Sequence, residues 1–189
     1  MSGKLIILCG PSGVGKSTLA HAVMKEIDQF DFSISVTTRS PRFGEEDSVD
    51  YYFLSADDFR KKLKAGAFLE TEEVYDGLWY GTLKSEVDRI HDKGRHVMFD
   101  VDVKGGVNIK KQFKEESLSI LIKPPSIQDL RKRLIERGTE TPETLETRMN
   151  RVREELGYED QFDLSIVNDD LDAAIKKLIE TVKSFLDED

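Results

Sequence analysis

Residues 5–17, with the sequence LIILCGPSGVGKS, decide the fold class of this 189-residue chain. Five apolar residues, typical of a buried strand, lead directly into a glycine-rich turn, and a helix is expected from about Ser17 to Ile27. The turn at residues 10–17, GPSGVGKS, matches the pattern G-x-x-x-x-G-K-[ST] in full. A strand, a glycine-rich loop and a helix in this order predict a site that binds the phosphates of a nucleoside triphosphate.

The chemistry of this loop depends on its backbone, its lysine and its serine. Glycines allow the chain to curl so that successive N–H groups point at phosphate oxygens, and the helix N-terminus adds roughly half a positive charge behind them. Lys16 is predicted to reach the β- and γ-phosphates, and the Ser17 hydroxyl to ligate Mg²⁺. A glycine-rich turn without a ligand is the alternative, but the strand before it and the helix after it favour a nucleotide. The motif alone does not identify the reaction.

Composition restricts the class of protein. With 38% hydrophobic and 34% charged residues, the chain is expected to be soluble, with enough apolar side chains for the core of one compact domain. No apolar stretch approaches the roughly 18 residues that a membrane-spanning helix needs. Neither a signal peptide nor a zinc cluster is apparent, and the single cysteine, Cys9, cannot form an intramolecular disulfide. These features favour a cytoplasmic protein.

The charge pattern points to small anionic ligands. A net charge of −9 argues against a nucleic-acid partner, because such binding depends on neutralising phosphates. Arginines nevertheless gather in two places, and an acidic chain that concentrates arginine in this way is typical of proteins that bind small phosphorylated molecules. The two groups are Arg39 with Arg42, and Arg131, Arg133, Arg137 and Arg148.

The remaining elements are expected from periodicity and capping signals. Short strands should occupy the β-branched and aromatic parts of residues 32–54. Later strands are expected at residues 68–75, 97–101, 118–122 and 165–167. Helices are expected at residues 56–64 after Ser55, at 84–92, from Ser126 to about 137, from Thr141 with Pro142 in its first turn, and at 171–186.

Strands that alternate with helices indicate an α/β fold, with a parallel sheet flanked by helices on both faces. The β-rich stretch at residues 32–80 interrupts this alternation. It therefore predicts an inserted subdomain outside the main sheet.

The arginine groups have different settings. Arg39 and Arg42 lie in an extended, proline-marked segment, and residues 50–53, DYYF, follow it. Paired guanidinium groups and a tyrosine hydroxyl suit a small anion, since arginine binds phosphate in a bidentate manner. On residue type alone, two solvated loop arginines are the more common explanation. Arg133 and Arg137 are one helical turn apart, so both can point to one face.

Taken in order, these motifs resemble guanylate kinases from the phosphate loop to the last strand. Beyond the loop, the resemblance rests on SVTTRSPR at residues 35–42, VDYYF at 49–53 and WYGT at 79–82. Further matches are FLE at 68–70, DVDVKG at 100–105, PPS at 124–126, RGT at 137–139 and IVNDD at 166–170. The ordered set is much more specific than a single phosphate-loop motif.

The resemblance implies roles for residues that would bind GMP. The implied contacts to its phosphate are Arg39, Arg42, Tyr51 and Tyr80. The implied contacts to its guanine ring are Ser35, Glu70, Thr82 and Asp102. Carboxylates suit this ring because its N1 and 2-amino groups are donors, an arrangement that adenine lacks. Asp100, at the end of an apolar strand, is grouped with these residues and is expected near Mg²⁺ or its water ligands.

The resemblance also implies a lid of arginines over the triphosphate. Arg133, Arg137 and Arg148 would neutralise charge on the transferring phosphoryl group, and with Lys16 and Arg39 they form the predicted catalytic set. The predicted ATP-binding residues are Gly10, Pro11, Ser12, Gly13, Val14, Gly15, Lys16, Ser17, Thr18 and Asn168.

The expected organisation is one guanylate-kinase-like domain over residues 1–189. Its approximate subregions are a core at residues 1–31, 95–125 and 158–189, a GMP-binding subdomain at 32–94 and a lid at 126–157. Against many relatives, the loop at residues 75–78 is one residue longer, and Thr82 replaces a common serine while keeping the hydroxyl.

The implied reaction is Mg²⁺-dependent, reversible transfer of the ATP γ-phosphoryl group to GMP, giving ADP and GDP. ATP and GMP are then the expected partners, with neither nucleic acid nor membrane among them. Three alternatives stay open: a kinase with another acceptor such as AMP or UMP, a non-catalytic guanylate-kinase-like module that binds peptides or phosphoproteins, and a P-loop GTPase or ATPase switch. The sequence does not distinguish a monomer from a homodimer.

Overall fold

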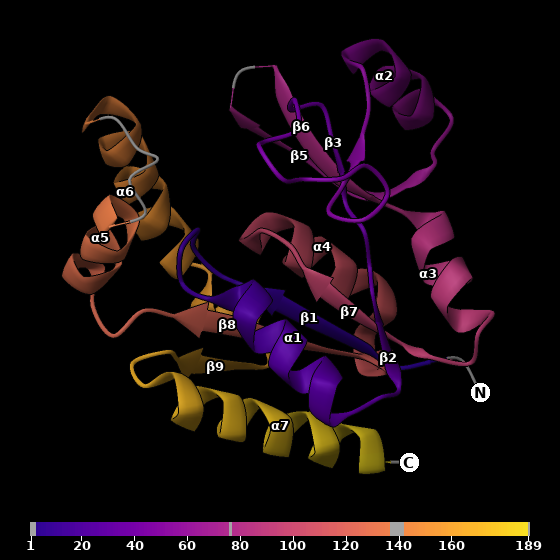
Figure 1. Cartoon of the computed structure of the whole chain (residues 1–189). Helices are drawn as coiled ribbons and strands as arrows, with labels where there is room; N and C mark the ends of the chain where they lie inside the picture. Colours follow the sequence, from indigo (N-terminus) through magenta and orange to yellow (C-terminus); the bar gives the residue numbers. More distant parts are fainter. Residues whose placement is uncertain (1–2, 76, 137–141, 189) are drawn as a thin grey trace. The chain divides into compact units, whose positions relative to one another are not determined.

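The structure of the chain, a computed structural model, describes residues 3–75, 77–136 and 142–188 (Figure 1). It divides into two compact units. Unit 1 contains Gly3 and Phe30–Val97, and unit 2 contains Lys4–Gln29 and the residues from Met98 onward. The phosphate loop therefore belongs to unit 2, and the β-rich stretch noted in the sequence belongs to unit 1.

The larger sheet has five strands in the order β2-β7-β1-β8-β9. Strand β1 pairs with β8 and β8 pairs with β9, both in parallel. The strands are β1 (Leu5–Cys9), β2 (Phe30–Phe32), β7 (His96–Asp100), β8 (Ser117–Lys123) and β9 (Leu164–Val167). All five side chains of β1 are fully buried, which explains why its sequence is continuously apolar rather than alternating. The predicted parallel sheet is confirmed.

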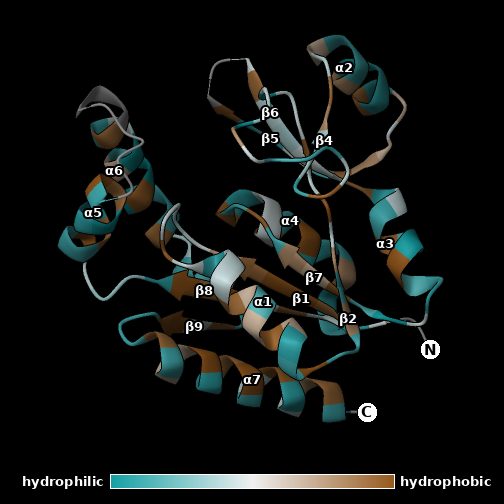
Figure 2. Ribbon diagram, in the orientation of Figure 1, coloured by the Kyte–Doolittle hydropathy of each residue, from teal (hydrophilic) through white to brown (hydrophobic). Residues whose placement is uncertain are grey.

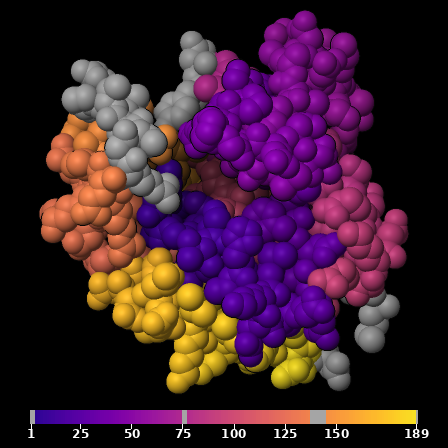
Figure 3. Space-filling view, viewed as in Figure 1, coloured from indigo at the N-terminus to yellow at the C-terminus, as the bar shows by residue number. Residues whose placement is uncertain are grey.

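Three helices of unit 2 cover the faces of this sheet (Figure 1). Helix α1 (Lys16–Glu26) and helix α7 (Leu171–Asp187) pack together on one face, and helix α4 (Val103–Phe113) lies on the other face against β1 and β8. Helix α7 turns its apolar side inward and its polar side outward (Figure 2). In the space-filling view its yellow atoms lie against the indigo N-terminal segment (Figure 3), in agreement with an ion pair of 2.9 Å between Lys183 and Glu26.

Two further helices of unit 2 carry the second arginine group. They are α5 (Ile127–Glu136) and α6 (Pro142–Leu156). Ser126 caps α5, because its Oγ accepts a hydrogen bond of 3.0 Å from the Asp129 N–H. Arg137 and Thr141, which the sequence placed at the end of the first helix and the start of the second, lie outside the described residues. Short 3-10 helices, η1 (Lys114–Glu116) and η2 (Glu159–Gln161), complete this unit.

Unit 1 is built on a second, mixed sheet in the order β4-β3-β6-β5. Its strands are β3 (Val36–Thr37), β4 (Tyr52–Phe53), β5 (Phe68–Tyr75) and β6 (Leu78–Leu83). Helices α2 (Ala56–Lys64) and α3 (Lys84–His91) accompany it. The core of this sheet contains Val36, Phe59 of α2 and Phe68, with the two phenylalanine rings stacked 4.5 Å apart. This small aromatic core packs the short strands of unit 1 against α2.

Helix α4 is an element that the sequence reading left unassigned. A pair of glycines, Gly105 and Gly106, lowers the helix propensity of this segment and hides the signal. The structure gives the reason for the second glycine: a Cβ at Gly106 would lie 2.0 Å from the Cys9 sulfur. Tight packing of α4 on β1 therefore takes precedence over intrinsic propensity.

Candidate active site

The phosphate loop follows β1 and ends at the first turn of α1. Gly13 and Gly15 have φ angles of 86° and 98°, a left-handed conformation that residues with a side chain rarely adopt. A Cβ on Gly15 would also lie 2.6 Å from the amide nitrogen of the Asn168 side chain. Both the curl of the backbone and its close approach to a neighbour therefore require glycine.

Two side chains at the start of α1 converge on one carboxylate. Lys16 Nζ donates a hydrogen bond of 2.8 Å to the Gly10 carbonyl and lies 3.6 Å from Asp100 Oδ1. Ser17 Oγ donates a hydrogen bond of 2.5 Å to Asp100 Oδ2. Asp100 ends β7, far from the loop in sequence, so the parallel sheet places an acidic side chain beside the lysine and the serine.

Asn168 fixes the loop from the end of β9. Its side chain is buried, and Nδ2 donates a hydrogen bond of 2.8 Å to the Val14 carbonyl. Its own carbonyl accepts a hydrogen bond of 3.0 Å from Arg133. From α6, Arg148 donates a hydrogen bond of 2.9 Å to Ser12 Oγ. Arginines of two helices thus reach the loop or its support, while the third predicted member, Arg137, lies outside the described residues.

Glu155 is a residue of this region that the sequence reading missed. It lies on α6 and accepts a hydrogen bond of 2.7 Å from Arg151, one turn earlier. Burial raises the pKa of the Glu155 carboxyl, while Arg151 and the charge of Lys16 act in the opposite direction. The R-x-x-x-E spacing of this pair was visible in the sequence, but nothing local distinguished it from a surface pair.

Asp102 has a local partner in this structure. Its Oδ1 accepts a hydrogen bond of 2.9 Å from the Gly105 N–H, so the side chain caps α4. One carboxylate oxygen suffices for this cap, which leaves the contact of Asp102 with guanine a prediction.

In unit 1, Arg39 lies among aromatic rings and one carboxylate. Its guanidinium carbon lies 5.2 Å from the ring centroid of Tyr51 and 5.7 Å from that of Phe53. Its Nε donates a hydrogen bond of 3.2 Å to the Tyr80 hydroxyl. The Tyr51 and Tyr80 rings meet edge to face, with centroids 6.0 Å apart. Tyr51 and Phe53 from one segment and Tyr80 from a later one therefore surround the Arg39 guanidinium.

Glu45, a second residue that the sequence patterns did not indicate, holds Arg39 in a two-point ion pair. The two nitrogen–oxygen distances are 2.7 Å and 2.9 Å. Glu45 Oε2 also accepts a hydrogen bond from the backbone N–H of Arg42, whose side chain is exposed. These contacts lower the pKa of the Glu45 carboxyl, and the hydrogen bonds to Glu45 and Tyr80 raise the pKa of the Arg39 guanidinium. Both groups are therefore charged at neutral pH.

The predicted base contacts Glu70 and Thr82 face each other across β5 and β6. Glu70 is 8% exposed and Thr82 is fully buried, and the Thr82 hydroxyl donates a hydrogen bond of 2.8 Å to Glu70 Oε1. Ser35 directly precedes β3, and its carbonyl accepts a hydrogen bond of 2.9 Å from the Tyr52 N–H of β4. A buried carboxylate beside a hydroxyl can recognise the donor edge of a purine.

Two other kinds of feature are absent from the described part of the chain. No group of three or more His, Cys, Asp or Glu side chains there is arranged to hold a metal ion. None of the described helices is both long and apolar enough to cross a membrane.

The loop on a parallel sheet, with lysine, serine and aspartate at its end, defines a P-loop nucleotide-binding protein. Comparisons with known proteins narrow this class. The family model described as guanylate kinase matches residues 2–185. The chain belongs to the guanylate kinase family, as the sequence predicted.

Individual relatives agree with the family match. The guanylate kinase of Bacteroides thetaiotaomicron is 47% identical over 189 residues, which cover 100% of this chain and 93% of that protein. The guanylate kinase of Porphyromonas gingivalis is 45% identical over 184 residues, with coverage of 97% and 98%. Among solved structures, a guanylate kinase from Anaplasma phagocytophilum matches with a TM-score of 0.78 and 27% identity, covering 97% of this chain and 86% of that one. The α/β fold class is thereby confirmed as well.

Proposed function

We propose that this chain transfers the γ-phosphoryl group of ATP to GMP, reversibly, to give ADP and GDP. Its curated relatives are named guanylate kinases. The observation that carries the proposal is the complete phosphate loop, with Lys16 and Ser17 both directed at Asp100. A family member that only bound peptides would have no use for this arrangement. The protein is inferred to work in the cytoplasm.

The donor side of the reaction depends on unit 2. Backbone N–H groups of the loop and the N-terminus of α1 bind phosphate oxygens, and Lys16 neutralises the β- and γ-phosphates. In this structure Arg148 donates to Ser12 Oγ and Arg133 donates to the Asn168 carbonyl. When ATP binds, both arginines can donate to phosphate oxygens instead of these neutral acceptors. Such exchange strengthens each hydrogen bond, because the new acceptor is charged. We assign Arg137 to the same set.

The residues at the end of the loop fit a magnesium ion bound together with the triphosphate. Ser17 Oγ and the Asp100 carboxylate are 2.5 Å apart and supply oxygen ligands, the type that Mg²⁺ prefers. When bound, the ion neutralises the charge that develops on the phosphates during transfer. Ser17 would bind it directly and Asp100 directly or through water.

The acceptor side depends on unit 1. Arg39, Arg42, Tyr51 and Tyr80 are the proposed contacts to the GMP phosphate. Four of the five N–H groups of Arg39 already have acceptors in Tyr80, Ser40 and Glu45. Arg39 therefore contributes mainly a positioned charge, and the exposed Arg42 side chain can contribute the bidentate contact.

Recognition of guanine is assigned to Glu70, Thr82, Ser35 and Asp102. The carboxylates accept hydrogen bonds from the N1 and 2-amino groups of guanine. Adenine offers no such pair of donors, so with AMP the buried Glu70 would lose the hydrogen bonds that guanine supplies. Selectivity against AMP follows from this unmet hydrogen bonding.

The experiment that tests the proposal is a coupled assay of ADP formation with Mg·ATP and a panel of GMP, dGMP, AMP, UMP and CMP. Turnover is expected with GMP, and with dGMP if the ribose 2′-hydroxyl is not read. Comparable turnover with AMP or a pyrimidine nucleotide would contradict the roles of Glu70 and Asp102. Binding of ATP without turnover of any acceptor would instead support a binding module.

A further inference from the structure

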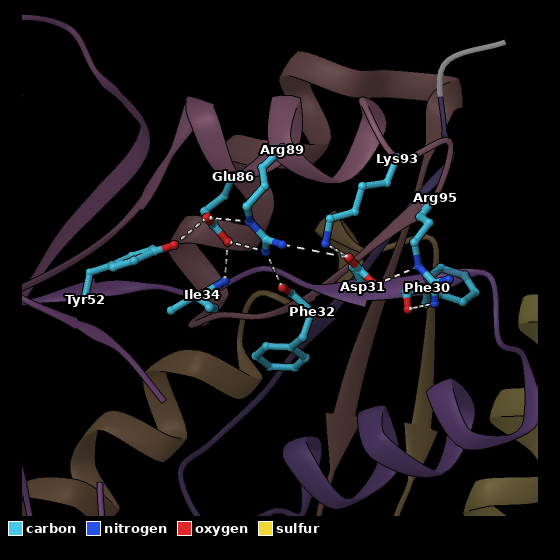
Figure 4. Close-up of polar contacts among 9 residues, drawn as sticks. All are labelled: Phe30, Asp31, Phe32, Ile34, Tyr52, Glu86, Arg89, Lys93 and Arg95. Atoms are coloured by element: carbon cyan, nitrogen blue, oxygen red, sulfur yellow. Dashed lines mark hydrogen bonds and ion pairs between the residues drawn. The ribbon is translucent and has the colours of Figure 1, made fainter. Parts of the chain in front are cut away.

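Unit 1 contains an ionic network around a buried carboxylate that none of the roles above uses (Figure 4). At its centre is Glu86 of α3, only 3% exposed. Its carboxylate accepts four hydrogen bonds, from the Ile34 N–H at 2.9 Å, the Tyr52 hydroxyl at 2.9 Å, and Arg89 Nε and NH2 at 3.0 Å and 2.8 Å. Both oxygens of the carboxylate are thereby paired.

Glu86 is a charged group in this site. Burial raises its pKa, but the hydrogen bonds from Arg89, Ile34 and Tyr52 outweigh that effect and the net pKa is lowered. Burial and the neighbouring carboxylate raise the pKa of the Tyr52 hydroxyl, so the tyrosine remains a donor. A buried carboxylate is a costly way to fill space, since a hydrophobic residue could do so without losing hydration. The directional contacts of Glu86 are what distinguish it from an apolar residue.

These contacts join three segments of unit 1. Ile34 lies in the connection from β2 to β3, Tyr52 lies in β4, and Glu86 itself lies in the first turn of α3. Arg89 also donates a hydrogen bond of 3.1 Å to the carbonyl of Phe32, the last residue of β2, just before this connection. The network therefore fixes where this connection runs relative to β4 and α3.

The two residues that Glu86 itself contacts outside α3 are each next to a residue proposed to bind GMP. Ile34 directly precedes Ser35, and Tyr52 directly follows Tyr51. The Tyr52 N–H in turn donates a hydrogen bond of 2.9 Å to the Ser35 carbonyl. Glu86 thus holds the two backbone segments that this hydrogen bond joins. One segment carries Ser35, a predicted contact to the base, and the other carries Tyr51, a predicted contact to the phosphate.

A second carboxylate extends the network toward the start of unit 1. Asp31 pairs with Lys93 at 2.8 Å, with Arg95 at 2.6 Å and, more distantly, with Arg89 at 3.8 Å. Arg89 is consequently held between Glu86 and Asp31. Its guanidinium cannot turn away from Glu86 without weakening the second contact.

We propose that Glu86 is a positioning residue for the acceptor, which holds Ser35 and Tyr51 in the geometry that binds GMP. The inference rests on the proposed function, because it concerns the acceptor of that reaction. Glu86 itself touches no substrate; it acts through Ile34 and Tyr52. Its loss should therefore affect the affinity for GMP and leave the ATP site and the chemical step unchanged.

The test is steady-state kinetics of Glu86→Gln, with GMP varied at saturating ATP and ATP varied at saturating GMP. Glutamine keeps the size of the side chain but removes the charge that Arg89, Ile34 and Tyr52 share. The KM for GMP is expected to rise by about tenfold, while kcat and the KM for ATP stay within about twofold. Tyr52→Phe, which removes one hydrogen bond, should give a smaller change in the same direction.

A variant with both substitutions shows whether Glu86 and Tyr52 act through the same contact or independently. If both residues act through one contact, Glu86→Gln with Tyr52→Phe should raise the KM for GMP by less than the product of the single effects. Tyr52→Phe also keeps the proposal testable if Glu86→Gln does not fold. An unchanged KM for GMP in folded Glu86→Gln, or equal rises in both KM values, would overturn the proposal.

Asp163→Asn is the matched control. Asp163 accepts hydrogen bonds from the Ser119 N–H and hydroxyl and pairs with Lys110 at 2.9 Å, all within unit 2. This carboxylate-to-amide change should lower the Tm and leave the KM for GMP unchanged. The acceptor panel on the wild-type protein reports on the proposed function separately: if wild type prefers another monophosphate, the reaction is misassigned, whereas the ratio of KM values between variant and wild type still tests positioning.

Discussion

The phosphate loop of unit 2 and the residues of unit 1 proposed to bind the acceptor are built for anion binding in different ways. The loop uses consecutive backbone N–H groups, and its glycines adopt conformations that only glycine favours. The acceptor residues are side chains, contributed by Arg39, by Tyr51 and by Tyr80 from separate parts of the chain. Each of those side chains needs neighbours to hold it, such as Glu45 for Arg39.

This difference predicts where each region is vulnerable. A backbone site is set by local conformation, so few supporting residues are needed and the key side chains act directly. A side-chain site depends on a supporting layer, so residues that never touch the ligand should alter its affinity. Substitutions in the two regions can test this contrast.

The largest effect is expected for Lys16→Ala. In the proposed reaction Lys16 places its charge at the phosphates, and no other side chain of the loop is a cation, so kcat should fall by on the order of a thousandfold. Lys25→Ala, on the exposed part of the same helix, is the control and should leave kcat unchanged. Activity of Lys16→Ala within threefold of wild type would contradict the role of the loop.

A smaller but selective effect is expected for Glu70→Gln. Replacing the buried acceptor with an amide should reduce the preference for GMP over AMP by about 10- to 100-fold, measured as the ratio of kcat/KM values. Glu73→Gln, exposed on the same strand, should not change this ratio. Equal losses with both nucleotides would mean that Glu70 does not read the base.

Glu45→Gln tests the supporting layer of Arg39. Without its two-point ion pair, Arg39 should lose its fixed orientation, and the KM for GMP should rise by roughly three- to tenfold with little change in the KM for ATP. A lower KM for GMP would have the opposite meaning. It would indicate that the Glu45 carboxylate competes with the GMP phosphate for the same guanidinium.

The smallest effect concerns the stability of unit 2 rather than binding. Burial raises the pKa of Asp163, but hydrogen bonds from Ser119 and Lys110 dominate and lower it. A lowered folded-state pKa gives stability that is present above the unfolded value of about 3.9 and is lost as the pH falls through the folded value. Urea unfolding should therefore show wild type more stable than Asp163→Asn by ~1 kcal/mol at pH 7, with the difference shrinking below about pH 4. A difference that stayed constant as the pH fell through the folded-state pKa of Asp163 would exclude this linkage.

Sequence patterns predicted most elements because their signals are local. The apolar run of β1, the Ser55 cap of α2 and the amphipathic α7 each appear in consecutive residues. Helix α4 was not predicted because two adjacent glycines lower its helix propensity, and one of them, Gly106, is required for close packing against Cys9. Propensity is therefore a weaker guide where two elements approach closely.

The site residues were likewise predicted only where a local motif marks them. Their identities were predicted from motifs and resemblance, and their individual roles remain predictions. Glu45, Glu86 and Glu155 were not predicted, because the sequence gives their residue type but not their partners. A glutamate on a helix or loop is most often solvated, and no local pattern tells a buried one apart.

The sequence by itself determined the family, the phosphate loop and the alternation of strands and helices, because each depends on neighbours in the chain. Tertiary structure alone decided that Asp100 meets Lys16 and Ser17, and that Glu86 ties Ile34 to Tyr52. These contacts join residues far apart in sequence, so they exist only once sheet register and helix packing have fixed their positions. The desolvation of a charge, and hence its need for partners, is likewise a property of the folded chain.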